Sequence, residues 1–128
     1  MEWVAIVTAV ALLEYVWFSI QVGRARGRTG VHAPATTGSP EFERYFRVQA
    51  NTLEQLILFL PGIWMFAHYV SAPVAAGLGV VYVVGRWLYY TTYTVDPAKR
   101  SAGFGLSMLP NLALVIGGLI GALCAALA

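Results

Sequence analysis

The chain is organised as four long apolar stretches separated by short polar connections. The stretches cover residues 3–22, 46–70, 72–94 and 104–128. Each reaches the ~20 residues that an α-helix needs to cross the hydrocarbon core of a bilayer. Since only helices and closed barrels satisfy their backbone hydrogen bonds in lipid, the pattern predicts an all-α integral membrane bundle of four transmembrane helices. These helices use up the chain, so we expect one domain over residues 1–128.

Composition and charge placement support a membrane setting. Hydrophobic residues make up 59% of the chain and charged residues 11%, whereas a soluble domain has roughly a quarter charged residues. Four arginines lie in the first connection, Lys99 and Arg100 lie in the third, and the second has no charge. By the positive-inside rule the first and third connections face the cytoplasm, with both termini on the opposite side. The composition suits a bacterial inner membrane. The net charge of +2 reflects this topology and indicates no nucleic-acid partner.

Two proline-containing sequences predict where helices begin. Ser39, Pro40 and Glu41 combine a capping side chain, a proline suited to the first helical position and an acid in the first turn. The second helix is therefore expected to begin near Glu41, before the membrane. Asp96 and Pro97 repeat this arrangement and predict that the fourth helix begins near Pro97.

The second helix carries a polar face inside its apolar stretch. Arg47, Asn51 and Glu54 are spaced i, i+4 and i+7, which places all three on one side of a helix. Polar groups are costly in lipid, so this face is expected to meet protein or water at a functional site.

The third helix carries a second such face, formed by Tyr82, Arg86, Tyr89 and Tyr93. The tyrosines also suit the aromatic belt of a membrane interface. Arg86 lies too deep for that role. Its alternatives are ligand binding and pairing with a buried acid such as Glu14 or Glu54, and we favour the pairing.

The combined groups match a small ligand that has both carboxylates and an amine. Guanidinium forks suit carboxylates, and an ionised acid suits an ammonium group. Glutathione has two carboxylates, one amine and one thiol, and it would enter from the cytoplasmic side.

Two stretches of the sequence resemble the MAPEG family, the membrane-associated proteins of eicosanoid and glutathione metabolism. They are residues 43–54, ERYFRVQANTLE, and residues 86–93, RWLYYTTY, with Arg100 seven residues later. The resemblance implies a homotrimer that holds one glutathione at each subunit interface. It implies that the peptide is held by Arg47, Asn51, Glu54, Tyr89 and Tyr93, and that Arg26 and Gln49 reach in from the neighbouring subunit.

The resemblance also implies a reaction. Arg100 matches the arginine that faces the thiol, so the expected activity is a membrane glutathione transferase that attacks hydrophobic electrophiles, with lipid hydroperoxides as further substrates for a peroxidase activity. Gln55 stands where leukotriene synthases of the family carry tyrosine, and Gly27 stands where they carry a second arginine. Arg28 is a candidate substitute for that arginine. These departures favour a transferase of broader specificity.

Two other functions remain open from the sequence. One is a non-enzymatic, lipid-presenting scaffold of the same family, although the arginine at position 47 favours an enzyme. The other is a small multidrug transporter, because such proteins also have four spans and use an intramembrane acid like Glu14 as a proton carrier. His32, His68 and Cys124 have no partners at metal-ligand spacing, so we expect no metal site.

Overall fold

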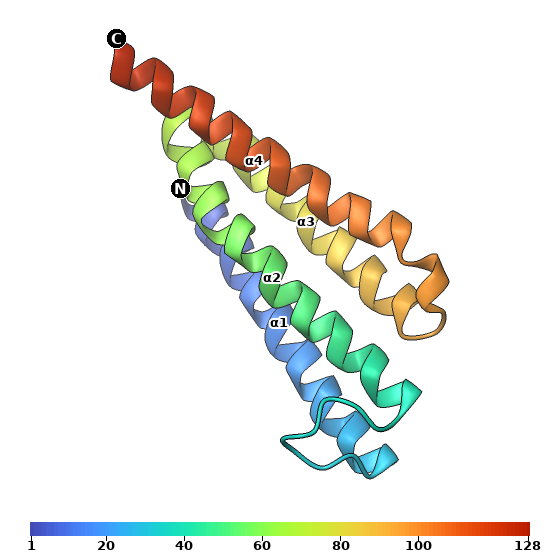
Figure 1. Ribbon diagram of the computed structural model, residues 1–128. Coiled ribbons are helices and arrows are strands. Elements are labelled where there is room, and N and C mark those ends of the chain that lie inside the picture. The colour runs from blue at the N-terminus through green and yellow to red at the C-terminus, as the bar shows by residue number, and fades with distance from the viewer.

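The computed structural model describes all residues from Met1 to Ala128 and forms a bundle of four helices (Figure 1). Its elements are α1 (Glu2–Thr29), α2 (Pro40–Tyr69), α3 (Ala72–Tyr93), a 3-10 helix η1 (Pro97–Lys99) and α4 (Ser101–Leu127). Both termini lie at one end of the bundle, and the connections at residues 30–39 and 94–100 lie at the other end. The predicted all-α membrane bundle is confirmed.

The outer surface of the bundle is suited to lipid. Three segments are long and apolar enough to span a membrane: Glu2–Thr29, Ala72–Tyr93 and Pro97–Leu127. The fourth expected span lies in α2, which is 30 residues long but carries charged groups such as Arg47 and Glu54 in its first half. Large apolar side chains remain exposed along all four helices. Lipid tails are as apolar as these side chains, so this exposure has little cost in a bilayer.

The two predicted helix starts have different outcomes. Ser39 caps α2 and accepts a hydrogen bond from the Phe42 N–H at 3.5 Å, as the sequence predicts. Asp96 instead caps η1, accepting from the Ala98 N–H at 3.1 Å. The chain therefore makes a 3-10 turn first, and α4 begins only at Ser101. The prediction that α4 begins near Pro97 is wrong by one turn of helix.

The helices pack around apolar clusters, of which the largest has 12 buried residues. At its centre the Phe59 ring stacks on Tyr82 with 4.1 Å between ring centroids, beside Ile63 and Leu114. A buried amide pair joins α2 to α4: Asn111 Nδ2 donates to Gln55 Oε1 at 2.8 Å. These contacts hold α2 and α4 in register at mid-membrane depth.

Glycine lets α3 and α4 approach each other closely at the loop end of the bundle. A Cβ atom added at Gly85 on α3 would lie 2.6 Å from the Leu106 backbone carbonyl carbon of α4. A Cβ atom added at Gly103 on α4 would overlap the backbone of Tyr89 on α3. Backbone atoms cannot yield as a flexible side chain does, so these two glycines fix the distance between the helices.

This packing predicts that Gly85→Ala lowers the free energy of unfolding by roughly 1–3 kcal/mol, the usual cost of overpacking. Gly77 is the matched control, because it lies on the same helix with no atom within 4 Å of an added Cβ. Gly77→Ala should leave stability unchanged or raise it by about 0.5–1 kcal/mol. Thermal unfolding of the two variants in detergent compares them directly. Equal midpoints would contradict the close approach at Gly85.

Candidate functional site

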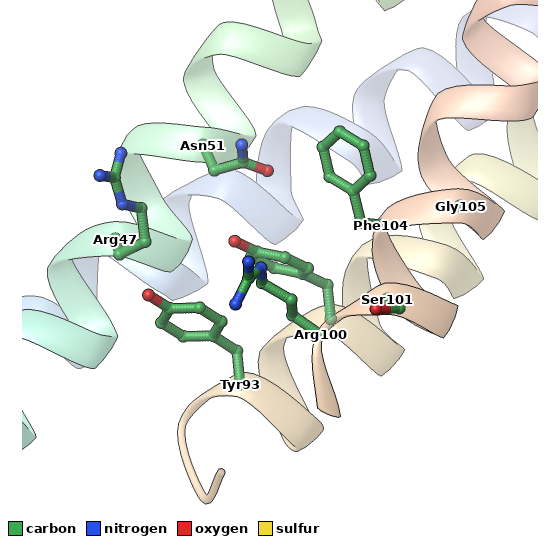
Figure 2. A pocket seen from close by; sticks show the side chains of 8 residues that line it. Arg47, Asn51, Tyr93, Arg100, Ser101, Phe104 and Gly105 are labelled. Atoms are coloured by element: carbon green, nitrogen blue, oxygen red, sulfur yellow. The ribbon is translucent and has the colours of Figure 1, made fainter. Parts of the chain in front are cut away.

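A cavity of about 690 Å³ opens at the loop end of the bundle, between α2 and the junction of α3 with α4 (Figure 2). Its lining residues come from three helices and are Arg47, Asn51, Tyr89, Tyr93, Arg100, Ser101, Phe104 and Gly105. The sequence predicts five of these eight as site residues. The structure therefore brings the two polar faces together with Arg100.

Local helix geometry places each group of polar side chains. Arg47 and Asn51 lie one turn apart on α2 and face the cavity. Tyr89 and Tyr93 lie one turn apart near the end of α3, with their rings stacked at a centroid distance of 5.3 Å. Across from α2, Arg100 occupies the N-cap of α4. The close approach of α3 and α4 at Gly103 brings Arg100 beside the tyrosines.

The cavity is electropositive. Within this chain, ion pairs form only between the N-terminus and Glu2 and between Arg28 and Glu41. Arg47 and Arg100 thus have no carboxylate partner, and both are exposed. Arg100 makes one hydrogen bond, from Nη1 to the Pro97 carbonyl oxygen at 3.3 Å. Two guanidinium groups remain available to an anionic ligand.

Asn51 lines the cavity, and its side-chain amide is not fully paired within the chain. Its Oδ1 atom is buried and has no hydrogen-bond partner. A buried acceptor without a partner is destabilising by about 1–3 kcal/mol.

Three predicted site residues lie outside the cavity of the single chain. Arg26 donates to the Ala35 carbonyl oxygen at 2.8 Å and lies over the Phe42 ring, so it holds the first connection against α2. Gln49 Nε2 donates to Ser19 Oγ of α1 at 3.0 Å. Glu54 is exposed on the outward face of α2. Gln49 and Glu54 belong to α2, which lines the cavity, whereas Arg26 belongs to α1, which does not.

Three residues that line the cavity were not predicted from the sequence. Ser101, Phe104 and Gly105 all lie on the first turns of α4. Phe104 lies four residues after Arg100, so helical periodicity could have placed it on the same face as Arg100. That argument requires the start of α4 at Ser101, which the sequence did not predict. Phe104 and Gly105 add an apolar wall on the α4 side of the cavity, across from α2.

A second hollow of about 360 Å³ adjoins the cavity on the side of the first connection. The two hollows share Arg47 and Tyr93. Arg44 and Glu43 of α2, with Thr36 and Thr37 of the first connection, line its other walls together with Phe46. The site therefore has room for a ligand that extends past Arg47.

The expected ion pair of Arg86 does not form. No carboxylate lies within 4.0 Å of its guanidinium, so the prediction of a direct pair with Glu14 or Glu54 is wrong. Instead Arg86 Nη2 donates to Thr52 Oγ1 at 2.8 Å. The Thr52 hydroxyl is therefore the hydrogen-bond acceptor of Arg86, where a carboxylate was expected.

Comparison with known proteins places the chain in one family. The sequence pattern of the MAPEG family matches residues 4–120. An uncharacterised protein of Synechocystis sp. is 50% identical over 92% of this chain and 86% of its own length. Human microsomal glutathione S-transferase 2 is 43% identical over 81% of this chain and 71% of its own length.

Guinea pig (Cavia porcellus) leukotriene C4 synthase is 42% identical over 77% of this chain and 65% of its own length. Together with the match over residues 4–120, these similarities cover nearly the whole bundle, including α2 and the start of α4. The chain belongs to the MAPEG family of membrane proteins.

Proposed function

We propose that this protein is a membrane glutathione transferase that binds glutathione in the cavity and attacks hydrophobic electrophiles with its thiolate. The observation that carries the proposal is the pair of guanidinium groups, Arg47 and Arg100, that face one cavity without carboxylate partners. The names of the relatives, glutathione S-transferase and leukotriene C4 synthase, agree with this ligand.

The lining residues offer a partner for each polar group of glutathione. The exposed guanidinium of Arg47 suits a carboxylate, which it can bind with two parallel hydrogen bonds. The side-chain amide of Asn51, which lines the cavity, suits the peptide group. The hydroxyl groups of Tyr89 and Tyr93 can donate to the remaining oxygen atoms.

Arg100 is proposed to activate the thiol. A free thiol has a pKa of about 8.5, so only a few per cent is thiolate at neutral pH. A guanidinium at the N-terminus of a helix stabilises the thiolate by its own charge and by the dipole of α4. Each unit by which the pKa falls increases the thiolate fraction up to about tenfold.

The electrophile would approach along the apolar wall of α4. Phe104 and Gly105 line the cavity where α4 meets the lipid-facing surface. The thiolate sulfur forms a bond to the electrophilic carbon, and the leaving group departs with the bonding electrons. The thiol proton is released to water when glutathione binds. The same thiolate would reduce a lipid hydroperoxide to an alcohol and water, with two glutathione molecules oxidised to the disulfide.

Membership of the MAPEG family favours this reaction over transport. The transporter hypothesis depends on Glu14 as a proton carrier, but small multidrug transporters form a separate family. A lipid-presenting scaffold is a second candidate within the family. The unpaired guanidinium of Arg100 at the cavity favours the enzyme, since a scaffold has no need for a group that stabilises a thiolate.

The proposed assembly is a homotrimer with the loop end in the cytoplasm. Glu54 is exposed among apolar side chains on α2, with Leu53 50% and Ile57 68% exposed. A carboxylate facing lipid is costly, so a second copy of the chain is proposed to cover this face. Arg26 and Gln49 would then serve the cavity of a neighbouring subunit.

Removal of the activating charge tests the reaction. Arg100→Ala should reduce conjugation of glutathione to an aryl halide by at least about tenfold at neutral pH, because the thiolate loses its stabilising cation. Lys99→Ala is the matched control, since it removes a neighbouring exposed cation that does not line the cavity. Initial rates at saturating glutathione, measured on detergent-purified protein, compare the two. Equal rates for both variants, or no conjugation by the wild type, would contradict the proposal.

Mixed trimers test whether subunits share a site. Coexpression of Arg26→Ala and Arg100→Ala chains places an intact Arg26 beside an intact Arg100 at one site of each mixed trimer. With equal expression, about one quarter of all sites should be intact by random assembly of a cyclic trimer. Conjugation by the purified mixture should therefore recover to about that fraction of wild type. Activity equal to the average of the two single-variant proteins would show that Arg26 serves its own subunit or no site at all.

A further inference from the structure

Arg86 is an arginine buried completely inside a membrane bundle, next to the cavity and not part of its lining. Its exposed fraction is 0%. Its only hydrogen bond runs from Nη2 to Thr52 Oγ1 of α2 at 2.8 Å, and its Nε and Nη1 atoms have no partner. A charged group in this setting is expected to have a function, because its burial is costly.

The Thr52 hydroxyl is fixed in orientation. Thr52 Oγ1 donates its own hydrogen to the Val48 carbonyl oxygen at 2.6 Å. The lone pairs of the oxygen atom are therefore left to accept from Arg86. Since Thr52 is 1% exposed, water cannot replace this acceptor, and the position of the Arg86 guanidinium depends on it.

The guanidinium in turn supports the ring of Tyr89. The Arg86 Cζ atom lies 4.4 Å from the centroid of the Tyr89 ring, which is within the range of a cation–π interaction. The Tyr89 ring also stacks with the ring of Tyr93. Only 3% of Tyr89 is exposed, and Gly103 presses on its backbone. The ring therefore has little freedom, and Arg86 is the charged group in contact with its face.

We infer that Thr52 and Arg86 form a line of positioning residues that holds the Tyr89 hydroxyl where it binds glutathione. This inference rests on the proposed function of the cavity. Arg86 acts through Tyr89 and does not touch the ligand. Its effect should therefore appear in the affinity for glutathione, whereas formation of the thiolate depends on Arg100.

Other groups around Arg86 do not replace this link. Glu14, Glu54 and Tyr82 lie close enough to interact with its charge, yet no carboxylate is within ion-pair distance. Glu14 Oε1 and Tyr82 Oη are themselves without hydrogen-bond partners. These groups can offset the charge of Arg86, but only Thr52 fixes the direction of its guanidinium.

Thr52→Val removes the acceptor and keeps the shape of the side chain. We expect glutathione to bind about fivefold more weakly, as loss of one hydrogen bond predicts, with the rate at saturating glutathione nearly unchanged. Thr52→Ser should restore wild-type affinity because the hydroxyl returns. Thr8→Val is the matched control: Thr8 makes the same bond to its own helix, to the Val4 carbonyl oxygen at 2.7 Å, far from the cavity. It should leave affinity unchanged.

A double-mutant cycle shows whether the effect passes through Tyr89. Tyr89→Phe keeps the ring over Arg86 and removes the hydroxyl, so Thr52→Val should add no further loss of affinity in that background. Arg86→Lys provides a second route if Thr52→Val does not fold, and it should also weaken binding only when the Tyr89 hydroxyl is present. An undiminished loss in the Tyr89→Phe background, or wild-type affinity of Thr52→Val, would overturn the inference. Failure of the wild type to bind glutathione would instead overturn the proposed function.

Discussion

The distance between α3 and α4 at their loop ends decides where the side chains of the cavity can lie. At Gly85 and Gly103 the two helices meet backbone to backbone, with no room for a Cβ atom. In a membrane, apolar burial gives little reason for helices to associate, so such close packing supplies much of the association energy. The same contact sets the first turns of α4 against Tyr89, which brings Arg100 to the stacked tyrosines. The close contact of α3 and α4 at Gly85 and Gly103 thus shapes both the bundle and the site.

A second constraint is that polar groups within the bilayer need partners from protein. Asn111 and Arg86 meet this constraint only in part: Asn111 Nδ2 donates to Gln55 Oε1 and leaves its own Oδ1 unpaired, and Arg86 donates to Thr52. The groups that do not meet it within one chain are informative. Asn51 lines the cavity and has an unpaired Oδ1 atom, and Glu54 leaves a carboxylate on the surface. The first lies beside the proposed ligand, and the second lies on the face proposed to meet a neighbouring subunit.

Much of this arrangement could be predicted from residue spacing, because helical periodicity decides which side chains share a face. The i and i+4 spacing of Arg47 with Asn51, and of Tyr89 with Tyr93, predicted two faces that the structure joins in one cavity. Pairing between helices could not be predicted in the same way. The expected pair of Arg86 with an acid is wrong because Arg86 instead donates to the Thr52 hydroxyl of α2. A threonine in a sequence does not indicate which side chain its hydroxyl will contact.

The start of α4 shows a further limit. Ser101, Phe104 and Gly105 enter the cavity because a 3-10 turn delays the helix by one turn, and the alternative between a 3-10 turn and an α-helical turn depends on tertiary contacts. Similarly, Arg26 and Gln49 have partners inside their own chain. A role in a neighbouring site can be judged only from an assembly.

The most direct test of this account is the ionisation state of bound glutathione. Glutathione is titrated into the wild-type protein at neutral pH, and the ultraviolet absorbance of the thiolate is recorded. This absorbance reports the ionisation of bound glutathione, and no electrophile is needed. The account predicts a saturable thiolate signal with release of protons, and no signal with S-methylglutathione, which has no thiol proton to lose. Glutathione that binds at the cavity and keeps its thiol protonated at neutral pH would contradict the central role of Arg100.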